Sequence, residues 1–443
     1  MTFSPQHIHD FLASHVSMRR FIVAFSGGLD STVLLHAMNN LRETHEFDLH
    51  AVHVNHGLHE DARQWAMHCK TICDAWKIPI QIREVTVKVE KGSSPEAVAR
   101  EARYTCFREL LEREVMMLTA QHQDDQLETF LLQALRGGGL AGLAAMPAMA
   151  PLGQGMLGRP LLNVTREELA VYAEMEGLNW LDDPSNLNLA FDRNYLRHRV
   201  LPVLRERWPS AGATISRAAK HCADGVELLE QLASSDLQQF AAAEGGNTLP
   251  VDIFQQLPRS RAVNLLRHWL RRLDLPLPSD TKAAHIFTDL LNAREERSPC
   301  ISWPGAEIRR YRNRLYAGEP LSAAPEGAYS WSLNGPLVLP AGLGELHAVP
   351  TTGRGLSRDK VAGETQVRFR DGGESLQPTG GRPTRSLKKL FQEAGIAPWL
   401  RSRIPLVFID DKLAAVADLW TVEEFAAGPD DPGLLINWSN KPF

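Results

Sequence analysis

The stretch RFIVAFSGGLDSTVLLHAM, residues 20–38, decides the fold of the N-terminal part of the chain. It opens with an apolar run, Arg20–Phe25, which predicts a short buried strand. The segment from Ser31 to Met38 predicts a helix. Between them lies Ser-Gly-Gly-Leu-Asp-Ser, where two glycines let the backbone approach a ligand closely. Because the backbone N–H groups of such a turn and a helix N-terminus attract anions, the stretch predicts a phosphate-binding unit.

The turn itself consists of Ser26, Gly27, Gly28, Leu29, Asp30 and Ser31. It lacks the GxxxxGK[ST] pattern of a Walker A loop, so it fits a pyrophosphate group better than a γ-phosphate cradle with a lysine. A carboxylate beside phosphates would repel them, and Asp30 therefore predicts a bound divalent cation. The alternative is an ordinary strand–turn–helix connection that binds nothing.

Three further apolar runs alternate with helix-like segments over the next hundred residues. Strands are predicted at Asp48–Asn55, Ile78–Val87 and Val115–Ala120, and helices at Glu60–Trp76, Ser94–Glu114 and Asp124–Leu135. This alternation predicts an α/β fold with a Rossmann-like parallel sheet covered on both faces. Ligands bind beyond the carboxyl ends of the strands in such sheets, which is where the Ser26–Ser31 turn would lie.

One histidine and three acidic residues follow the fourth predicted strand. They are His122, Asp124, Asp125 and Glu128. Asp124 and Glu128 share one helical face, and carboxylate oxygens are suitable ligands for Mg²⁺. The alternative is a helix N-terminus whose acidic residues suit its dipole. The turn at the end of the first strand favours the functional interpretation.

Two further groups lie near predicted strand ends. His53, His56 and His59 form H-x-x-H-x-x-H, but this spacing matches no standard zinc pattern and no cysteine joins it, so a loop lining a pocket is favoured. On the third predicted helix, Arg100 and Arg103 are three residues apart. An arginine that faces the strand ends can hold a phosphate bidentately. The alternative is ordinary surface charge.

Composition and charge narrow the class of protein. The 443 residues include 44% hydrophobic and 23% charged residues, which is ordinary for a folded chain and excludes disordered or fibrous classes. The net charge is −5, yet residues 354–403 hold 11 basic and 5 acidic residues, so this segment carries +6 and the rest −11. A local basic patch is the usual electrostatic sign of a phosphate backbone.

Basic residues with aromatic neighbours occur in two places. Phe191–Lys220, predicted to be helical, holds 7 basic and 2 acidic residues. The predicted RNA contacts in the two regions are Arg193, Asn194, Arg197, Arg199, Lys388, Lys389, Trp399 and Arg401. Basic side chains suit an RNA backbone, and an aromatic ring suits base stacking. A solvated basic face is the alternative.

Cysteine usage and the N-terminus predict a cytoplasmic protein. Five cysteines without a CxxC pair do not make a disulfide framework, so they are interpreted as buried thiols in a reducing compartment. The first fifteen residues show no secretion signal. Residues 137–158 are uncharged, but seven glycines make them a poor membrane-spanning helix.

The second half of the chain has weaker signals. Thr165–Glu176 begins with a capping-box pattern. Residues 221–317 are predicted to be mostly helical. A Pro/Gly/Ala-rich stretch at 318–327 predicts a linker. Beyond it, strands are predicted at Pro336–Leu339 and Gln366–Arg370, and a helix at Leu387–Ala394.

Taken together, these motifs resemble those of the bacterial tRNA(Ile)-lysidine synthetases, a family of N-type PP-loop ATPases. The resemblance covers nearly the whole chain, and the combined set of motifs is highly specific. It rests on SGGLDS (26–31), HVNHG (53–57), AREARY (99–104), TAQHQDDQLETFLL (119–132), RGGGLAGL (136–143), RPLL (159–162), DDPSN with DRNYLRHRVLPVL (182–204), and KKLFQEAGIAPWLRSRIPLVF (388–408).

The resemblance implies a fold and a division into domains. The N-terminal domain would be a PP-loop domain with a sheet like that of the adenine nucleotide alpha hydrolases. We predict residues 1–217 as this catalytic domain, 218–320 as a mostly helical substrate-binding domain, and 321–443 as a small α+β tRNA-binding domain. About 150 residues per domain agrees with three.

The resemblance also implies a reaction. ATP would adenylate O2 of the wobble cytidine in isoleucine tRNA with a CAU anticodon, and the ε-amine of free L-lysine would then replace AMP at C2. The product, lysidine, changes the codon read from AUG to AUA and the amino-acid identity from methionine to isoleucine.

Site residues follow from the same resemblance. Ser26–Ser31 would bind ATP, Asp30 and Asp125 would hold Mg²⁺, and Asp124 or Asp125 would take the proton of the lysine amine. Arg103 would position a phosphate or a carboxylate, and the basic residues named above would contact the tRNA. A homodimer is compatible with the sequence.

Three alternatives belong to other classes of protein. A tRNA thiolase of similar fold would use cysteine pairs, and no CxxC is present. A PP-loop amidotransferase would need an ammonia-producing partner, and residue 2 is threonine rather than the N-terminal cysteine of a glutaminase. A catalytically inactive tRNA-binding scaffold would have no need of an intact Ser26–Ser31 turn.

Overall fold

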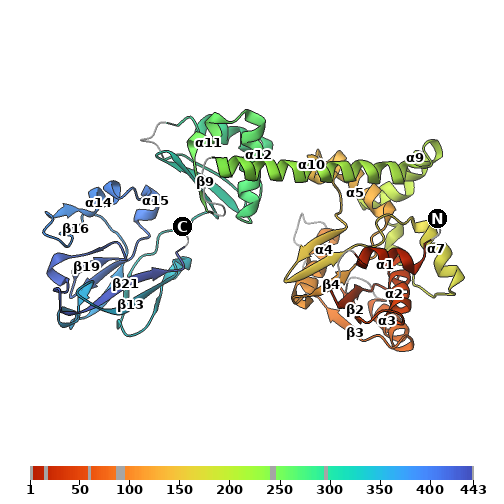
Figure 1. Ribbon diagram of the computed structural model, residues 1–443, viewed down its shortest axis with the longest axis horizontal. Coiled ribbons are helices and arrows are strands. Elements are labelled where there is room, and N and C mark those ends of the chain that lie inside the picture. Colours follow the sequence, from red (N-terminus) through yellow and green to blue (C-terminus); the bar gives the residue numbers. More distant parts are fainter. Residues whose placement is uncertain are drawn as a thin grey trace. The chain divides into compact units, whose positions relative to one another are not determined.

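The computed structural model describes residues 3–13, 18–57, 61–85, 95–239, 246–293 and 298–441. The chain forms two compact units, Met1–Leu229 and Glu230–Phe443 (Figure 1). His59, Ser94 and the last two residues of the predicted strand Ile78–Val87 lie outside the described residues. Within the described ranges, no helix is both long and apolar enough to cross a membrane.

A six-stranded sheet forms the centre of the first unit. Its order is β3-β2-β1-β4-β6-β5, and the strands are β1 (Arg20–Ala24), β2 (Asp48–Asn55), β3 (Ile80–Glu84), β4 (Val115–Leu118), β5 (Met149–Leu152) and β6 (Gly155–Gly158). All neighbouring pairs are parallel except β5 with β6. The predicted parallel sheet is confirmed, and β1 lies at its centre.

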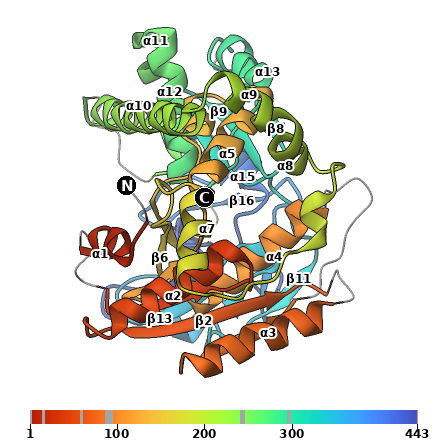
Figure 2. The same ribbon diagram turned by 90° about the vertical axis from the view of Figure 1, so that its right-hand side faces the viewer.

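Helices cover both faces of this sheet (Figures 1 and 2). The helices of this part of the chain are α1 (Pro5–Ala13), α2 (Leu29–Arg42), α3 (Ala62–Ala75), α4 (Pro95–Leu110), α5 (Gln123–Leu135), α6 (Leu140–Leu143) and α7 (Arg166–Met175), of which α5 and α6 lie beyond the two faces. Val33 and Leu34 of α2 belong to one buried core, whereas Phe107 of α4 belongs to a second. The sheet is therefore buried on both sides, which explains why its central strands are nearly all apolar.

The predicted capping box at the start of α7 is confirmed. Thr165 Oγ1 accepts a hydrogen bond from the backbone N–H of Glu168 at 3.2 Å, and Oε2 of Glu168 accepts from the N–H of Thr165 at 2.9 Å. Both otherwise unpaired donors of the first turn are satisfied, so the helix begins where the sequence pattern indicates.

The predicted helical stretch Phe191–Lys220 is confirmed, and the structure divides it into several helices. The segment consists of α8 (Asp192–Tyr195), a π-helical turn (Leu196–Val200), α9 (Leu201–Arg207) and the start of α10 (Ala211–Gln239). Pro202 stands in the first turn of α9, where it gives up no helical hydrogen bond, and Pro209 stands in the break before α10. A helix of 29 residues then runs on past residue 217.

The second unit begins with a mixed α and β region. Its helices are α11 (Val251–Gln256), α12 (Arg259–Arg272) and α13 (Asp280–His285), and its strands β7 (Thr248–Pro250), β8 (Cys300–Trp303), β9 (Ala306–Tyr311) and β10 (Arg314–Gly318) pair in the order β7-β10-β9-β8. The prediction that residues 221–317 are mostly helical is therefore wrong for 300–318. These strands are short, and arginines interrupt the alternation that would have marked them.

Three antiparallel sheets and two α-helices complete the second unit. The two larger sheets have the orders β11-β15-β18-β19-β20 and β12-β13-β21-β14, and the smallest pairs β16 (Ser375–Leu376) with β17 (Arg385–Ser386). The strands are β11 (Ala328–Ser330), β12 (Leu337–Val338), β13 (Glu345–Thr352), β14 (Leu356–Ser357), β15 (Thr365–Arg368), β18 (Leu406–Ile409), β19 (Lys412–Val416), β20 (Trp420–Thr421) and β21 (Pro432–Ser439), and the helices are α14 (Leu387–Glu393) and α15 (Pro398–Arg401). This agrees with the predicted α+β region. The domain boundaries at 217 and 320 stay predictions.

Candidate active site

The Ser26–Ser31 turn joins β1 to α2 at the carboxyl edge of the sheet. Ser26 Oγ and Ser31 Oγ are 3.0 Å apart, and Ser31 Oγ also donates to the Gly28 carbonyl at 3.0 Å. The backbone N–H of Leu181 donates to the Gly27 carbonyl at 2.9 Å. These bonds fix the turn from within and from the segment that leads into DDPSN, so its conformation is set before any ligand binds.

Gly27 needs to be glycine for two reasons. Its φ of +84° lies in the left-handed region, and a Cβ there would be 2.9 Å from Sγ of Cys69 in α3. Burial raises the pKa of the Cys69 thiol to about 12, so it stays protonated. Cys69 is thus a structural thiol that packs beneath the turn.

Of the histidine triplet, His53 and His56 lie within the described residues and His59 lies outside them. His53 is buried, and its Nδ1 is 2.9 Å from the Phe25 carbonyl and 3.3 Å from Cys69 Sγ. Among the described residues, no group of three or more His, Cys, Asp and Glu is placed to hold a metal ion. His53 instead supports the turn that follows β1.

His122, at the end of β4, brings two predicted site residues together. It is the N-cap of α5, where its Nδ1 accepts from the N–H of Asp124 at 3.2 Å. Its Nε2 is 3.6 Å from Oδ2 of Asp30 and 3.4 Å from Oδ2 of Asp125. Burial of the ring lowers the pKa of His122, but the two carboxylates outweigh burial and hold this pKa above its usual value.

Asp125 and Glu128 bind two arginines from the next part of the chain. Glu128 is 0% exposed. Its two oxygens accept from Nε of Arg193 and Nε of Arg197, each at 2.6 Å, and Asp125 Oδ1 is 3.0 and 3.4 Å from the same two guanidinium groups. Burial raises the pKa of Asp125, but His122 and Arg193 overcome this and hold it below its usual range. A buried charge network of this kind needs every partner.

Sequence reasoning named Arg193 and Arg197 as RNA contacts and missed their pairing with Glu128. The pairs are 65 and 69 residues apart, so no local spacing could indicate them. Of the other residues predicted there, Asn194 donates to the Asn188 carbonyl at 3.0 Å, and Arg199 is exposed. The tRNA contacts of all four stay predictions.

Two more predicted residues have specific partners. Asp124 Oδ1 accepts from Arg205 of α9 at 2.5 Å. On α4, Nε of Arg103 donates to Nε2 of His56, which follows β2, at 3.4 Å. Burial and the Arg103 charge lower the pKa of His56 to about 4, so the ring is neutral and able to accept this bond. The structure thus places Arg103 beside the carboxyl end of β2, next to the strand that carries the turn.

One carboxylate oxygen at the site lacks a partner. Oδ1 of Asp30 is buried and has no hydrogen-bond partner among the described residues. Buried polar atoms are almost always satisfied, so an orphaned carboxylate oxygen next to an anion-binding turn fits a bound cation. In contrast, both oxygens of Asp125 are already engaged by Arg193, Arg197 and the N–H of His122.

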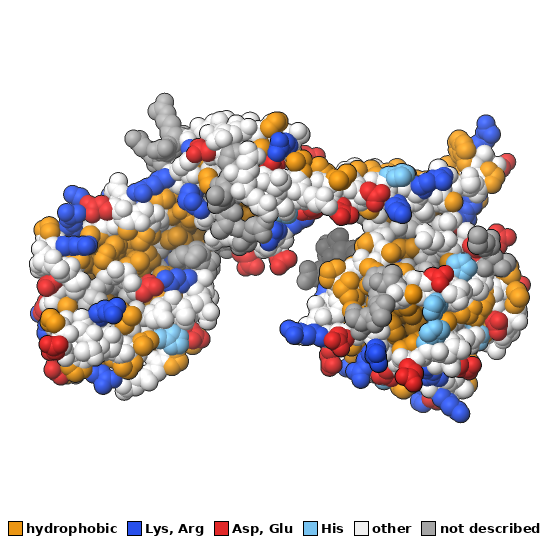
Figure 3. Space-filling view, viewed as in Figure 1, with side chains coloured by type: hydrophobic (Ala, Val, Ile, Leu, Met, Phe, Trp, Pro, Cys, Tyr) orange, Lys and Arg blue, Asp and Glu red, His pale blue; other side chains and the backbone are white. Residues whose placement is uncertain are grey.

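The predicted RNA-binding residues of the second unit differ in their surroundings. Lys388 and Lys389 of α14 are exposed, and Figure 3 shows lysine and arginine side chains at that end of the unit. Trp399 is half-buried and packs edge-on against Tyr311 and Tyr316, with ring centroids 6.2 and 5.4 Å apart. Arg401 donates to the Ile396 carbonyl at 2.9 Å. Trp399 and Arg401 therefore pack within the unit, and their contact with RNA stays a prediction.

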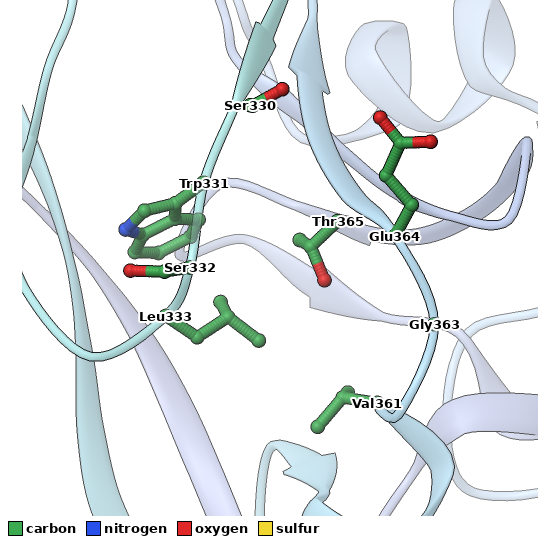
Figure 4. A pocket seen from close by; sticks show the side chains of 8 residues that line it. All are labelled: Ser330, Trp331, Ser332, Leu333, Val361, Gly363, Glu364 and Thr365. Carbon is green, nitrogen blue, oxygen red and sulfur yellow. The ribbon is translucent and has the colours of Figure 1, made fainter.

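A cavity in the second unit does not extend the phosphate-binding features. It has a volume of about 510 Å³ and lies between the end of β11 and the start of β15 (Figure 4). Its lining includes Ser330, Trp331, Leu333, Glu364 and Thr365, without a lysine or arginine. Glu364 accepts from Gln366 Nε2 at 2.7 Å. A phosphate backbone would find no basic partner there.

Comparison with known proteins agrees with this geometry. A PP-loop domain family matches residues 2–204, a TilS substrate binding domain matches 249–316, and a TilS substrate C-terminal domain matches 365–438. The fold and the turn thus define an ATP-using enzyme of the PP-loop class, with a parallel sheet and its nucleotide turn after the central strand.

Curated relatives identify the family within that class. A tRNA(Ile)-lysidine synthase from Coxiella burnetii is 44% identical over 98% of this chain and 96% of its own length. Another from Methylococcus capsulatus is 42% identical over 94% and 95%. The chain belongs to the tRNA(Ile)-lysidine synthase family, which makes it a ligase that modifies tRNA.

Solved structures of similar fold have low scores. A U34-tRNA thiolase from Methanococcus maripaludis has a TM-score of 0.42 and 17% identity, and covers 49% of this chain and 77% of that one. A TilS C-terminal domain structure has a TM-score of 0.21 and 21% identity, and covers 25% and 95%. The family assignment rests on the sequence relatives.

Proposed function

We propose that the protein joins free L-lysine to C2 of the wobble cytidine in isoleucine tRNA with a CAU anticodon, at the expense of ATP. The observation that carries this proposal is the juxtaposition of the Ser26–Ser31 turn with Asp30, His122 and Asp125 at one edge of the sheet, in a chain of the tRNA(Ile)-lysidine synthase family. An anion-binding turn then lies beside carboxylates that can bind a cation and accept a proton.

In the first step, O2 of the cytidine forms a bond to the α-phosphorus of ATP, and the bond to pyrophosphate breaks. The N–H groups of the Ser26–Ser31 turn and the N-terminus of α2 stabilise the charge on the departing pyrophosphate. The unpaired Oδ1 of Asp30 is a suitable ligand for Mg²⁺. Asp125 is a less suitable ligand, because both of its carboxylate oxygens already accept hydrogen bonds. Bound Mg²⁺ would neutralise negative charge on the phosphates.

In the second step, the ε-nitrogen of lysine forms a bond to C2, the bond from C2 to the adenylated oxygen breaks, and AMP leaves. The amine must lose a proton to become nucleophilic, so a base is required. We assign this role to Asp124, because its carboxylate pairs with Arg205, whereas the carboxylate of Asp125 is held by four donors.

Positively charged residues would position the substrates. Arg103, held by the neutral His56, lies one strand from the turn and is proposed to contact the triphosphate. Arg199, Lys388 and Lys389 are exposed and are proposed to contact the tRNA backbone. The cytidine must leave its stack to reach the site. A cytoplasmic location and a homodimer stay predictions, and light scattering tests the latter.

The test is incorporation of labelled lysine. Purified protein is mixed with ATP, Mg²⁺, labelled L-lysine and isoleucine tRNA with a CAU anticodon. We expect label in that tRNA, dependent on ATP, and none when the wobble base is U. Release of pyrophosphate and AMP with no label in the tRNA would mean that lysine is not the nucleophile, and no release of pyrophosphate would exclude the adenylation step.

A further inference from the structure

Arg159, the first residue of the RPLL motif, is a buried cation without an anionic partner. It directly follows β6 and is only 5% exposed. Its NH1 donates to the Pro147 carbonyl at 2.8 Å, and its backbone N–H donates to the Ala148 carbonyl at 2.9 Å. Its buried Nε has no acceptor, and no carboxylate lies within ion-pair distance of its guanidinium, among the residues that the structure describes.

A second buried arginine shows what a satisfied guanidinium looks like in this chain. Arg310 is 7% exposed and also has carbonyl partners only. Its Nε donates to the Arg312 carbonyl at 3.1 Å, and its NH1 donates to the Leu290 carbonyl at 3.2 Å. Arg310 thus caps the ends of chain segments, and none of its buried nitrogen atoms lacks a partner. In Arg159, by contrast, the buried Nε–H group has no acceptor in the described part of the chain. Burying a charged group without full compensation costs free energy.

The position of Arg159 relates it to the candidate active site. β6 pairs in parallel with β4, and the N–H of Thr119, just after β4, donates to the Gly158 carbonyl at 3.0 Å. Arg159 and the segment that leads to His122 and Asp124 therefore emerge at the same edge of the sheet. Neighbouring strands are about 4.8 Å apart, so β6 lies one strand from β4 and about 10 Å from β1 and its turn.

We infer that Arg159 binds the α-carboxylate of the free amino-acid substrate, an inference that rests on the proposed function. The planar guanidinium with donors on one edge matches a carboxylate. From its carboxylate carbon to its ε-nitrogen, an extended lysine measures about 7 Å by standard bond lengths. A lysine anchored at β6 therefore reaches over β4 and brings its ε-amine towards Asp124, while the nucleotide phosphates remain at the turn after β1.

A substrate pair tests this assignment directly. L-Lysinamide has the same amines as L-lysine but no carboxylate. We expect wild-type protein to use lysine with a kcat/KM about 10- to 100-fold higher than lysinamide, which corresponds to one charged bidentate contact. In Arg159→Gln, kcat/KM for lysine should fall by that factor, mostly through KM, while kcat/KM for lysinamide should hardly change. The preference for lysine over lysinamide should therefore approach one.

A purely structural arginine would give a different result. Its loss would lower kcat/KM for both substrates equally and keep the wild-type preference, and that outcome overturns the assignment. Wild-type protein that uses both substrates equally well would overturn it too. Arg310→Gln is the matched control, because it removes a buried arginine elsewhere and should keep the preference.

Folding and the underlying reaction are checked separately. Circular dichroism reports whether Arg159→Gln folds. If it does not, Arg159→Lys takes its place, because lysine keeps the positive charge but lacks the two parallel N–H donors of a guanidinium. An unchanged preference for lysine over lysinamide in that variant also overturns the assignment. Release of pyrophosphate from ATP with tRNA in the absence of lysine should persist in every folded variant. Its absence in wild-type protein would instead count against the proposed function itself.

Discussion

Oδ2 of Asp30 lies 3.6 Å from Nε2 of His122, so the first turn of α2 and the N-cap of α5 meet through these two side chains. The two helices follow β1 and β4, which are neighbours in the sheet although about ninety residues apart in the chain. The pyrophosphate turn and the acidic helix are therefore parts of one site.

Asp30→Ala should abolish adenylation and leave tRNA binding nearly intact. The substitution removes the buried orphan oxygen that fits a cation and one of the two carboxylates that face His122. Pyrophosphate release in the presence of tRNA and ATP measures the step, and filter binding of labelled tRNA measures affinity.

Asp48→Ala is the control for this experiment, since Asp48 is an exposed carboxylate of the same unit whose contacts are Arg20 and His50. Its pyrophosphate release should match that of wild-type protein. Comparable turnover in Asp30→Ala would remove Asp30 from the active site.

Glu128→Gln should destabilise the first unit. The carboxylate of Glu128 is fully buried and serves Arg193 and Arg197, which are only 24% and 28% exposed. Removing one partner of a buried ion pair leaves uncompensated charge and typically costs about 3 kcal/mol or more. For a unit of this size that corresponds to a fall in Tm of roughly 6 °C or more, which thermal unfolding followed by circular dichroism will detect.

Glu101→Gln provides the comparison, because Glu101 pairs with Arg108 at 2.9 Å on the surface, with a side chain 69% exposed. An exposed pair contributes less than about 1 kcal/mol, so Tm should hardly move. Equal Tm values for the two variants would show that the Glu128 network adds no more than a surface pair.

Gly27→Ala should lower ATP-dependent AMP formation by about tenfold or more. The new Cβ would lie 2.9 Å from Cys69 Sγ, and the left-handed backbone of Gly27 costs about 1 kcal/mol in a residue with a side chain. The turn must shift to relieve the contact, and its N–H groups then no longer match the pyrophosphate. AMP formation at saturating tRNA measures the effect.

Two further variants separate the backbone strain of a side chain at a positive φ from the steric clash of the new Cβ with Cys69. Gly177→Ala introduces a side chain at a φ of +61° where no atom lies within 4 Å of the new Cβ, so it tests the backbone cost alone. Cys69→Ala in the Gly27→Ala background removes the sulfur and should restore part of the activity. No recovery would mean that the contact with Cys69 is not what constrains the turn.

The fold around the turn was predictable because its signals are local. Arg20–Phe25, the turn and α2 follow one another in the sequence, and the central strands β1 and β4 are short apolar runs. In contrast, β5 and β6 were missed because glycines and Pro151 fill that segment, and they pair only through contacts with β4 and with each other. Strands β8 to β10 were missed because short hairpins rich in arginine carry little alternation.

The positions of the candidate site residues were easier to predict than their partners. Asp30, Asp124 and Asp125 follow strand ends, which indicated that they lie at one edge of the sheet, and their roles stay predictions. That Arg193 and Arg197 meet Glu128 depends on packing between segments more than sixty residues apart. Residue type suggested RNA contacts for these arginines, because a sequence shows the charge of a guanidinium and not the carboxylate that it faces.

Replacing Lys388 and Lys389 together by glutamine should weaken tRNA binding and reduce its dependence on salt. Both side chains are exposed on α14 in the basic segment 354–403. Each phosphate contact that is lost should lower the slope of log K against log salt by about 0.7 to 0.9, so the pair should change it by about 1.4 to 1.8. The control is Lys412→Gln, because Lys412 Nζ is 2.6 Å from Glu424 and already paired. Binding titrations at several salt concentrations measure the slopes, and an unchanged slope in the double variant would show that this part of α14 is ordinary surface.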